Sequence, residues 1–327
     1  MCTCITYENG DFYFGRNLDL EDSFGEKVVV TPRNYPFCWR EMEAPLKTHF
    51  AMIGMAAVAK GYPLYAEAVN EKGLGMAGLN FPGNAYYNSE KEEGKHNAAS
   101  FELIPWLLGS CENVEEAAGL LRKANIRDIS FAEQMPPAPL HWMIADRARC
   151  IVVEAVKEGI QIYENPFGVL TNNPPFPYHQ MNLRNYLNLT PNSPANRFCQ
   201  GVELETYGEG MGAMGLPGDA SPASRFVKAA FLKWNSASDK EETANLSQFF
   251  HILDNVSMVR GAVVTDSGKY DITTYSCCVN VRTGVYYYKT YENARIQAVD
   301  MRAEDLDGQD LAVYELEKHE EIRYHNR

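Results

Sequence analysis

The sequence lacks any apolar run long enough to cross a membrane. Its first residues, MCTCITYENG, also lack the basic region and the apolar stretch of roughly 7–15 residues that define a secretory signal peptide. Together the two absences predict a cytoplasmic protein that is not inserted in a membrane.

Positive charge is scarce. The 327 residues hold 30 Lys and Arg against 43 Asp and Glu, which gives a net charge of −13 at pH 7. Nucleic acids and anionic membrane surfaces attract basic proteins and repel acidic ones. The charge balance therefore argues against both as partners and favours solubility.

Several motifs for metals and cofactors are also missing. The eight cysteines are scattered, and neither Cys2-x-Cys4 nor Cys277–Cys278 has a second Cys or His pair at zinc spacing. The seven histidines form no HExxH, there is no GxSxG, and the Gly-rich stretch GMGAMGLPG lacks the GKS/T ending of a phosphate-binding loop. The sequence predicts no disulfide framework, no metal site and no cofactor.

What is present indicates a folded protein with a large core. Hydrophobic residues make up 45% of the chain and aromatic residues 12%. Strands, helices, strands, helices and strands follow one another, and hairpins dominate the connections. This order predicts an α+β fold in which helices pack outside antiparallel sheets, with residues 2–327 forming a single domain.

Alternating apolar and polar residues predict the strands. CITY and DFYFGR flank Asn9-Gly10, a type I′ turn signal, so the chain is expected to open with a hairpin. The stretch 70–83, NEKGLGMAGLNFPG, predicts a buried strand that ends in a loop. Further strands are expected as a hairpin from 27–40 and 50–59, a three-strand meander over 141–165, and a C-terminal group over 270–301.

Four helices are expected. Residues 102–111 are predicted to be helical with one apolar face, and Asn113 is expected to cap a second helix over 114–124, with Glu116 as capping-box partner. The other two are predicted over 224–237 and 245–256. Loops are expected at 165–180 and 185–222, and a polar tail after about residue 303.

Cys2 is the first candidate for chemistry. If Met1 is removed, Cys2 carries a thiol and a free α-amine on one carbon atom. A thiol of pKa about 8.5 needs a base near neutral pH, and an α-amine that titrates at about 7.7–8.0 can be that base. The alternative is a small buried residue on the first strand.

Arg16 and Asp19 follow the first hairpin in GRNLD. The partner strand of the hairpin returns Arg16 toward residue 2. There a guanidinium could favour the thiolate and a carboxylate could orient the amine. A surface salt bridge at a strand end is the other interpretation.

Amide and guanidinium side chains supply further candidates. Asn80, in GLNFPG, and Asn172, in LTNNPP, follow apolar runs, and side-chain amides are good oxyanion donors, although asparagine is also a common turn residue. Arg225 opens a helix, where its charge opposes the helix dipole. His251, in QFFHIL, is more typical of a core or helix-face residue.

These stretches together resemble the choloylglycine hydrolase family, which contains bile salt hydrolases and penicillin V acylases. The resemblance runs nearly from end to end. It is carried by MCT, FGRNLD, VTPRNYPF, YPLYAEAVNEKGLGMAGLNFPG, LHWMIAD, NPFGVLTNNP, GLPGDASPASRFVKAAF, QFFHIL and YYYKTYEN.

The resemblance implies a four-layer αββα sandwich of the N-terminal nucleophile (Ntn) hydrolases. It implies that Cys2 attacks the amide carbonyl, that Arg16 and Asp19 assist the thiol and amine, and that Arg225 supports the nucleophile. Asn80 and Asn172 are implied at the oxyanion site. Substrate contacts are expected from Asn80 and, by location, from Leu18, Phe24, Phe131 and Met135, which could equally be ordinary core residues.

Conjugated bile salts are the expected substrate, because Asn80 stands where penicillin acylases more often carry an aromatic residue. The resemblance also implies a bacterial homotetramer. A penicillin V acylase, another acyl-amide hydrolase of the same family, a conventional Cys–His hydrolase and a non-catalytic steroid- or acyl-amide-binding protein remain the alternatives.

Overall fold

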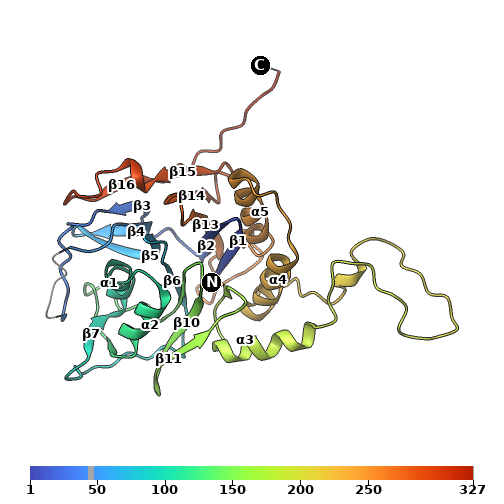
Figure 1. The fold of residues 1–327 in the computed structure, drawn as a ribbon, viewed down its shortest axis with the longest axis horizontal. Coiled ribbons are helices and arrows are strands. Elements are labelled where there is room, and N and C mark those ends of the chain that lie inside the picture. Colours follow the sequence, from blue (N-terminus) through green and yellow to red (C-terminus); the bar gives the residue numbers. More distant parts are fainter. Residues whose placement is uncertain (43–47, 327) are drawn as a thin grey trace.

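Two antiparallel sheets form the centre of the computed structural model, which describes residues 1–42 and 48–326 (Figure 1). The six strands of the first sheet lie in the order β12 (Val169–Leu170), β1 (Cys2–Asn9), β2 (Asp11–Leu20), β13 (Ile272–Asn280), β14 (Val285–Thr290) and β15 (Gln297–Asp300). The second has the order β11 (Gly159–Glu164), β10 (Cys150–Val156), β9 (Leu140–Ala145), β6 (Gly75–Asn80), β5 (Tyr62–Asn70), β4 (Met52–Ala59), β3 (Glu26–Thr31) and β16 (Ala312–Glu315).

Helices cover both outer faces. The helices are α1 (Leu103–Ser110), α2 (Val114–Leu121), α3 (Phe176–Asn182), α4 (Pro222–Asn235) and α5 (Glu242–Asp254). Figure 1 shows α1 and α2 on one side of the sheets and α4 and α5 on the other. Helix α1 packs on β5 and β6, whereas α4 packs on β1 and β12. The layers are therefore α, β, β and α, which confirms the predicted sandwich.

Two apolar clusters fill the spaces between these layers. The first contains residues of both sheets, such as Phe14 and Val69, and extends to Phe249 of α5. The second lies between the eight-stranded sheet and its helices and contains Trp106 and Trp142. The eight-stranded sheet therefore contributes one face to each cluster, because side chains alternate along its strands.

The predicted opening hairpin is confirmed, but the prediction of a type I′ turn at Asn9-Gly10 is wrong. Cys2 pairs with Leu18, and Asn9 pairs with Asp11, as neighbouring antiparallel strands require. Gly10 has a φ of 81°. Asn9 is absent from the non-glycine residues with positive φ in the described chain, and a type I′ turn needs positive φ at both central positions.

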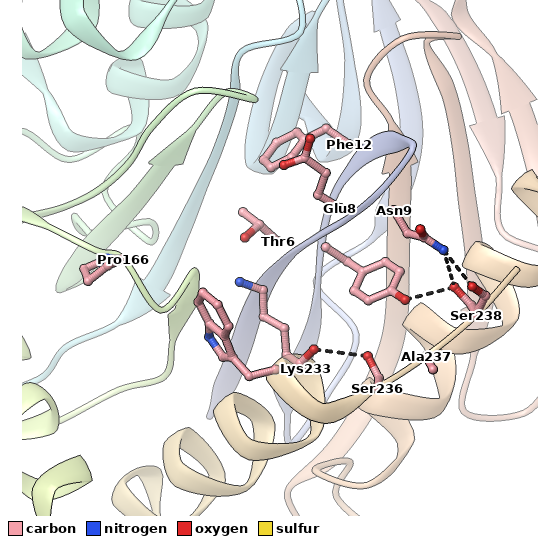
Figure 2. Close-up of a pocket in the computed structure, with 11 residues that line it drawn as sticks. Thr6, Glu8, Asn9, Phe12, Pro166, Lys233, Ser236, Ala237 and Ser238 are labelled. Carbon is pink, nitrogen blue, oxygen red and sulfur yellow. Dashed lines mark hydrogen bonds between the residues drawn. The ribbon is translucent and has the colours of Figure 1, made fainter. Parts of the chain in front are cut away.

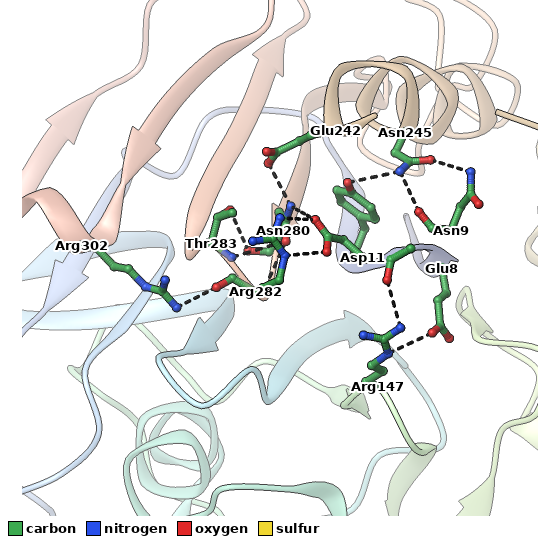
Figure 3. Close-up of polar contacts among 12 residues, drawn as sticks. Glu8, Asn9, Asp11, Arg147, Glu242, Asn245, Asn280, Arg282, Thr283 and Arg302 are labelled. Carbon is green, nitrogen blue, oxygen red and sulfur yellow. Dashed lines mark hydrogen bonds and ion pairs between the residues drawn. The ribbon is translucent and has the colours of Figure 1, made fainter. Parts of the chain in front are cut away.

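Polar side chains tie this hairpin to the C-terminal one (Figure 3). Asp11 accepts hydrogen bonds from Arg282 Nε at 2.6 Å and Nη2 at 2.7 Å, beside the β13–β14 turn. Asn280 Nδ2 donates to Asp11 at 3.0 Å and to Glu242 of α5 at 2.9 Å. These contacts join segments of the first sheet that are about 270 residues apart in the chain.

Other predictions were confirmed or corrected at the level of elements. The 141–165 meander is confirmed as β9, β10 and β11, and Asn113 caps α2 by accepting a bond from Glu116 N at 3.0 Å. The expected single apolar face of α1 was wrong, because nearly all of its residues are buried. The expected loop at 165–180 contains β12 and most of α3.

Two pairings were not predicted. Strand β16 of the C-terminal tail pairs with β3. Strands β7 (His96–Ala99) and β8 (Ala124–Arg127) pair in parallel, and α1 and α2 lie between them in the chain, so one strand–helix–strand crossover accompanies the antiparallel sheets. Both pairings join segments far apart in sequence, and short edge strands carry little pattern of their own.

Candidate active site

Cys2 lies at the start of β1, inside the sandwich. Its residue is 5% exposed, and its side chain borders a cavity of about 370 Å³. Arg16 and Leu18 border the same cavity from the neighbouring strand, because Cys2 and Leu18 are paired and alternate residues share a face. The first hairpin therefore brings the candidate thiol and guanidinium together, as predicted.

Asn172 holds the backbone of Cys2. Its Oδ1 accepts hydrogen bonds from Cys2 N at 2.8 Å and from Arg225 Nη2 at 2.8 Å. Its Nδ2 donates to Asn80 O at 2.8 Å, so one of the two N–H bonds of the amide is left for another acceptor. The structure thus brings Cys2, Asn80, Asn172 and Arg225 into one constellation.

Arg225 is the buried cation on the other side of Cys2. Nη1 donates to Cys2 O and to Thr3 Oγ1, and Nε donates to Ala220 O at 2.9 Å. Burial lowers the pKa of Arg225, and nearby Asp19 opposes that shift. These contacts inside the sandwich explain why Arg225 stands at the start of α4, where its charge opposes the helix dipole.

Met1 precedes Cys2, and its terminal ammonium is bound by Asp19 and Asp271. Its ammonium donates to Asp19 O at 2.7 Å and to Asp271 Oδ2 at 3.1 Å. The Asp19 carboxylate accepts from Thr273 Oγ1 at 2.6 Å, and burial raises the pKa of Asp19, opposed by Arg225. In this form the nitrogen of Cys2 is an amide, which has no basic lone pair.

The cavity beside Cys2 is mainly apolar. All five expected substrate contacts border it, namely Leu18, Phe24, Asn80, Phe131 and Met135. The sequence analysis did not identify the contributions of β5, α1 and β9, which are Leu64, Tyr65, Ala66, Ile104, Leu140 and Trp142. No local pattern separates these residues from ordinary core residues, since the cavity exists only where the elements meet.

Two histidines behind Asn172 were also missed. His141 Nε2 donates to Thr171 O at 3.0 Å, and His179 Nε2 donates to Asn172 O at 3.0 Å. Both histidines are fully buried, and the other ring nitrogen of His141 lies 3.3 Å from Glu154 Oε1. They hold the backbone of the loop that presents Asn172.

A second cleft lies elsewhere, between β1 and the end of α4 (Figure 2). Its volume is about 610 Å³, and Glu8, Lys233 and Ser238 contribute polar groups to it. Lys233 Nζ donates to Phe167 O at 2.7 Å, and burial lowers the pKa of Lys233 to about 8. None of the candidate residues from the sequence lines this cleft, so the cavity at Cys2 is the candidate active site.

Comparisons with known proteins agree with this geometry. The profile of the family described as linear amide C-N hydrolases, choloylglycine hydrolase family, matches residues 2–314. A bile salt hydrolase/transferase of Lactiplantibacillus plantarum is 50% identical over 316 residues, which are 97% of each chain. No helix in the described residues is both long and apolar enough to cross a membrane.

Solved structures show the same architecture. The C2A mutant of the conjugated bile acid hydrolase from Clostridium perfringens superposes with a TM-score of 0.91 at 41% identity, over 100% of both chains. The penicillin V acylase from Agrobacterium tumefaciens, at 19% identity, has a TM-score of 0.74 and covers 95% of this chain and 90% of its own. At this low identity, the similarity to the penicillin V acylase shows a shared fold only.

A four-layer sandwich whose first strand begins with a cysteine is the architecture of an Ntn hydrolase. More narrowly, the chain belongs to the choloylglycine hydrolase family and is an amide hydrolase acting on C–N bonds.

Proposed function

We propose that this enzyme hydrolyses the amide bond of glycine- or taurine-conjugated bile salts, with Cys2 as nucleophile. The observation that carries the proposal is the meeting of Cys2, Asn172 and an apolar cavity of about 370 Å³. This volume lies within the range of ligand pockets, and its apolar lining suits a steroid. Relatives that cover nearly the whole chain carry the name bile salt hydrolase/transferase.

The reaction requires removal of Met1. The α-amine of Cys2 then takes the thiol proton, and the thiolate attacks the carbonyl carbon. The free N–H of Asn172 donates to the oxyanion, with the Asn80 segment holding that amide in place. The α-ammonium returns a proton to the leaving amine, and a thioester remains on Cys2.

Water completes the cycle. The neutral α-amine removes a proton from water, whose oxygen attacks the thioester carbonyl and releases the bile acid and the thiol. Asp19 is proposed to orient the amine, since its backbone already binds the ammonium of Met1. Arg225 fixes the carbonyl of Cys2, and Arg16 supplies positive charge beside the sulfur.

The test is product release by protein shown by intact mass to lack Met1. Glycocholate, taurocholate and penicillin V are assayed side by side. We expect release of glycine or taurine, and loss of nearly all activity in Cys2→Ser. Cys38→Ser, which changes an exposed thiol away from the cavity, is the matched control.

The outcomes separate the alternatives. Dominant cleavage of penicillin V would keep Cys2 as nucleophile and overturn the substrate. Full activity in Cys2→Ser would overturn the nucleophile. Activity that survives an N-terminal extension would favour a conventional Cys–His hydrolase, and binding of bile salts without release of product would favour a binding protein.

We propose further that the enzyme is a homotetramer. The segment between α3 and α4 extends away from the sandwich (Figure 1) and exposes large apolar side chains, among them Leu187 at 84%, Phe198 at 92% and Tyr207 at 86%. Exposed apolar groups of this size are typical of interfaces. Sedimentation equilibrium measures the mass, and a monomer would contradict the proposal. The cytoplasmic location stays a prediction.

A further inference from the structure

Glu67 is a carboxylate inside the sandwich core. It belongs to β5 of the eight-stranded sheet and is 1% exposed. Its side chain crosses to the six-stranded sheet, where Tyr275 OH donates to Oε2 and Tyr286 OH donates to Oε1, both at 2.7 Å. Cys277 Sγ donates to Oε1 at 3.5 Å. Three side chains of one sheet thus bind a single carboxylate of the other.

The donors around Glu67 are in their protonated forms. Burial raises the pKa values of Tyr275, Tyr286 and Cys277 well above the usual ranges. Burial also raises the pKa of Glu67, and the charge of Arg16 opposes that shift. A carboxylate that accepts from three neutral donors and faces a cation is the arrangement that stabilises the ionised form.

Arg16 is the cation. Its Nη1 lies 3.8 Å from Glu67 Oε2 and donates to the carbonyls of Ala66, at 3.2 Å, and Gly78. Nη2 is buried and has no hydrogen-bond partner within the described chain. Burial disfavours the charged guanidinium, but negative charge at neighbouring Cys2 and Glu67 holds the pKa of Arg16 above its usual range.

The strand register places this pair beside the nucleophile. Arg16 pairs with Cys4 on one side and with Cys277 on the other, and Cys2 pairs with Leu18. Cys2 and Arg16 are therefore diagonal neighbours on one face of adjacent strands, and both border the cavity. Glu67 lies one step further, behind the guanidinium.

A buried ion pair of this kind is a poor source of stability. Taking both charges out of water costs free energy that their attraction often fails to repay, and apolar residues of similar volume commonly do as well. Apart from the three donors, the core around the pair is apolar, with Val69 on the strand of Glu67 and Ala77 opposite Glu67 on β6. The charges therefore point to a role in the reaction.

We propose that Glu67 is a positioning residue for Cys2: its carboxylate holds Arg16 in place from behind and partly offsets the positive field that Arg16 exerts on the thiol. This inference rests on the proposed role of Cys2 as nucleophile. It assigns the strand residue Glu67, with its two tyrosines, to the active site.

The test compares Glu67→Gln with the parent enzyme after removal of Met1. The rate at which iodoacetamide alkylates Cys2 is measured from pH 5 to pH 10 by mass spectrometry of the N-terminal peptide, so other cysteines do not contribute. Arg16 keeps its three carbonyl acceptors, on Asn17, Ala66 and Gly78, but loses the anion behind it. We expect the midpoint of the profile to move by about one unit toward lower pH.

Two variants separate charge from structure. Glu67→Asp keeps the charge, and its midpoint is expected to return to the parent value. Glu71→Gln, a matched control, removes the carboxylate that binds Arg33 at 2.6 Å in the turn directly after β5, and its midpoint should not move. If the midpoint moved by the same amount in Glu67→Gln and Glu71→Gln, the shift would reflect the loss of a carboxylate in general and not the charge behind Arg16.

Other results would overturn the proposal. An unchanged midpoint, or one that moves toward higher pH, in Glu67→Gln contradicts it. If that variant does not fold, Tyr286→Phe tests the same point, because losing a donor favours protonated Glu67 and moves the midpoint in the same direction by less. Alkylation needs no substrate, so the result is independent of whether bile salts are the substrate.

Discussion

At the scale of residues, Asn172 serves two neighbours with one amide group. The oxygen of its side chain receives Cys2 N and Arg225, and the nitrogen binds Asn80 O and keeps one free N–H. The same contacts that position the nucleophile therefore fix the direction of the free donor. A preorganised donor of this kind stabilises a developing oxyanion at little cost when the reaction occurs.

We expect Asn172→Asp to lower kcat by about 10²–10³-fold with a small change in KM, because the variant keeps the acceptor but has no N–H for the oxyanion. Steady-state hydrolysis of glycocholate measures both constants. The control is Asn173→Ala, which loses a bond from Asn173 Nδ2 to Pro82 O at 2.8 Å and should stay within a few-fold of the parent. Equal losses in both variants would mean that the loop, and not the oxyanion donor, was disturbed.

Residues were predictable where a short motif carries the chemistry. Cys2, Arg16 and Asp19 belong to one hairpin, so their meeting follows from local pairing. Glu67 and His179 were not identified, because their partners lie in other layers. The one signal in the sequence is the acidic residue within the apolar strand YPLYAEAVN, where a charge at an inward position needs a partner.

At the scale of elements, α3 acts as a support for the Asn172 loop. His179 donates to Asn172 O at 3.0 Å and stacks on Phe226 of α4, with ring centroids 4.7 Å apart. Its Nδ1 is buried without a partner in the described chain. The helix was expected to be loop, because Pro and Asn dominate the segment that leads into it, and only packing against α4 reveals its role.

Burial lowers the pKa of His179 from its usual 6.5, opposed by the bond to Asn172. The unfolded chain therefore binds a proton near pH 6.5 before the folded one does. The neutral His179 of the folded state therefore contributes to the free energy of unfolding in full above pH 6.5. This contribution is lost as the pH falls from 6.5 toward the pKa of His179 in the folded state, by at most about 1.4 kcal/mol per pH unit.

His179→Gln removes that titration and can keep a donor to Asn172 O. We expect urea unfolding between pH 7.5 and pH 5 to show a smaller loss of stability in the variant than in the parent. His251→Gln, which changes an exposed residue of α5, is the control. Parallel curves for the His179 variant and the parent would show that His179 does not titrate over this range in the folded enzyme.

Elements with a strong local pattern were predicted well. The opening hairpin, the meander and helices α2, α4 and α5 follow from alternation, capping and turn residues. Strands β7, β8 and β16 were not predicted, since each is short and is defined by a partner far along the chain. The fully buried α1 shows the same limit, because tertiary packing and not amphipathicity sets its surroundings.

At the scale of the whole molecule, the first strands and strands from the last third of the chain share a sheet. Strand β13 pairs with β2, and β12 pairs with β1, so residues before and after the long segment between α3 and α4 complete one structure. The two apolar clusters also meet at the eight-stranded sheet, which contributes a face to each. We therefore propose that residues 2–327 form one domain.

One domain predicts one unfolding transition. Trp106 and Trp142 report on the cluster under α1, whereas Cys277 and Cys278, both fully buried, report on the cluster between the sheets. Tryptophan fluorescence and the thiol reactivity of those two cysteines, measured by pulsed alkylation across a urea series, should give the same midpoint. Midpoints that differ would mean that the helical layer of α1 and α2 unfolds apart from the sheet sandwich. In that case the active site, whose cavity borders both Ile104 of α1 and Cys2, would be lost at the earlier transition.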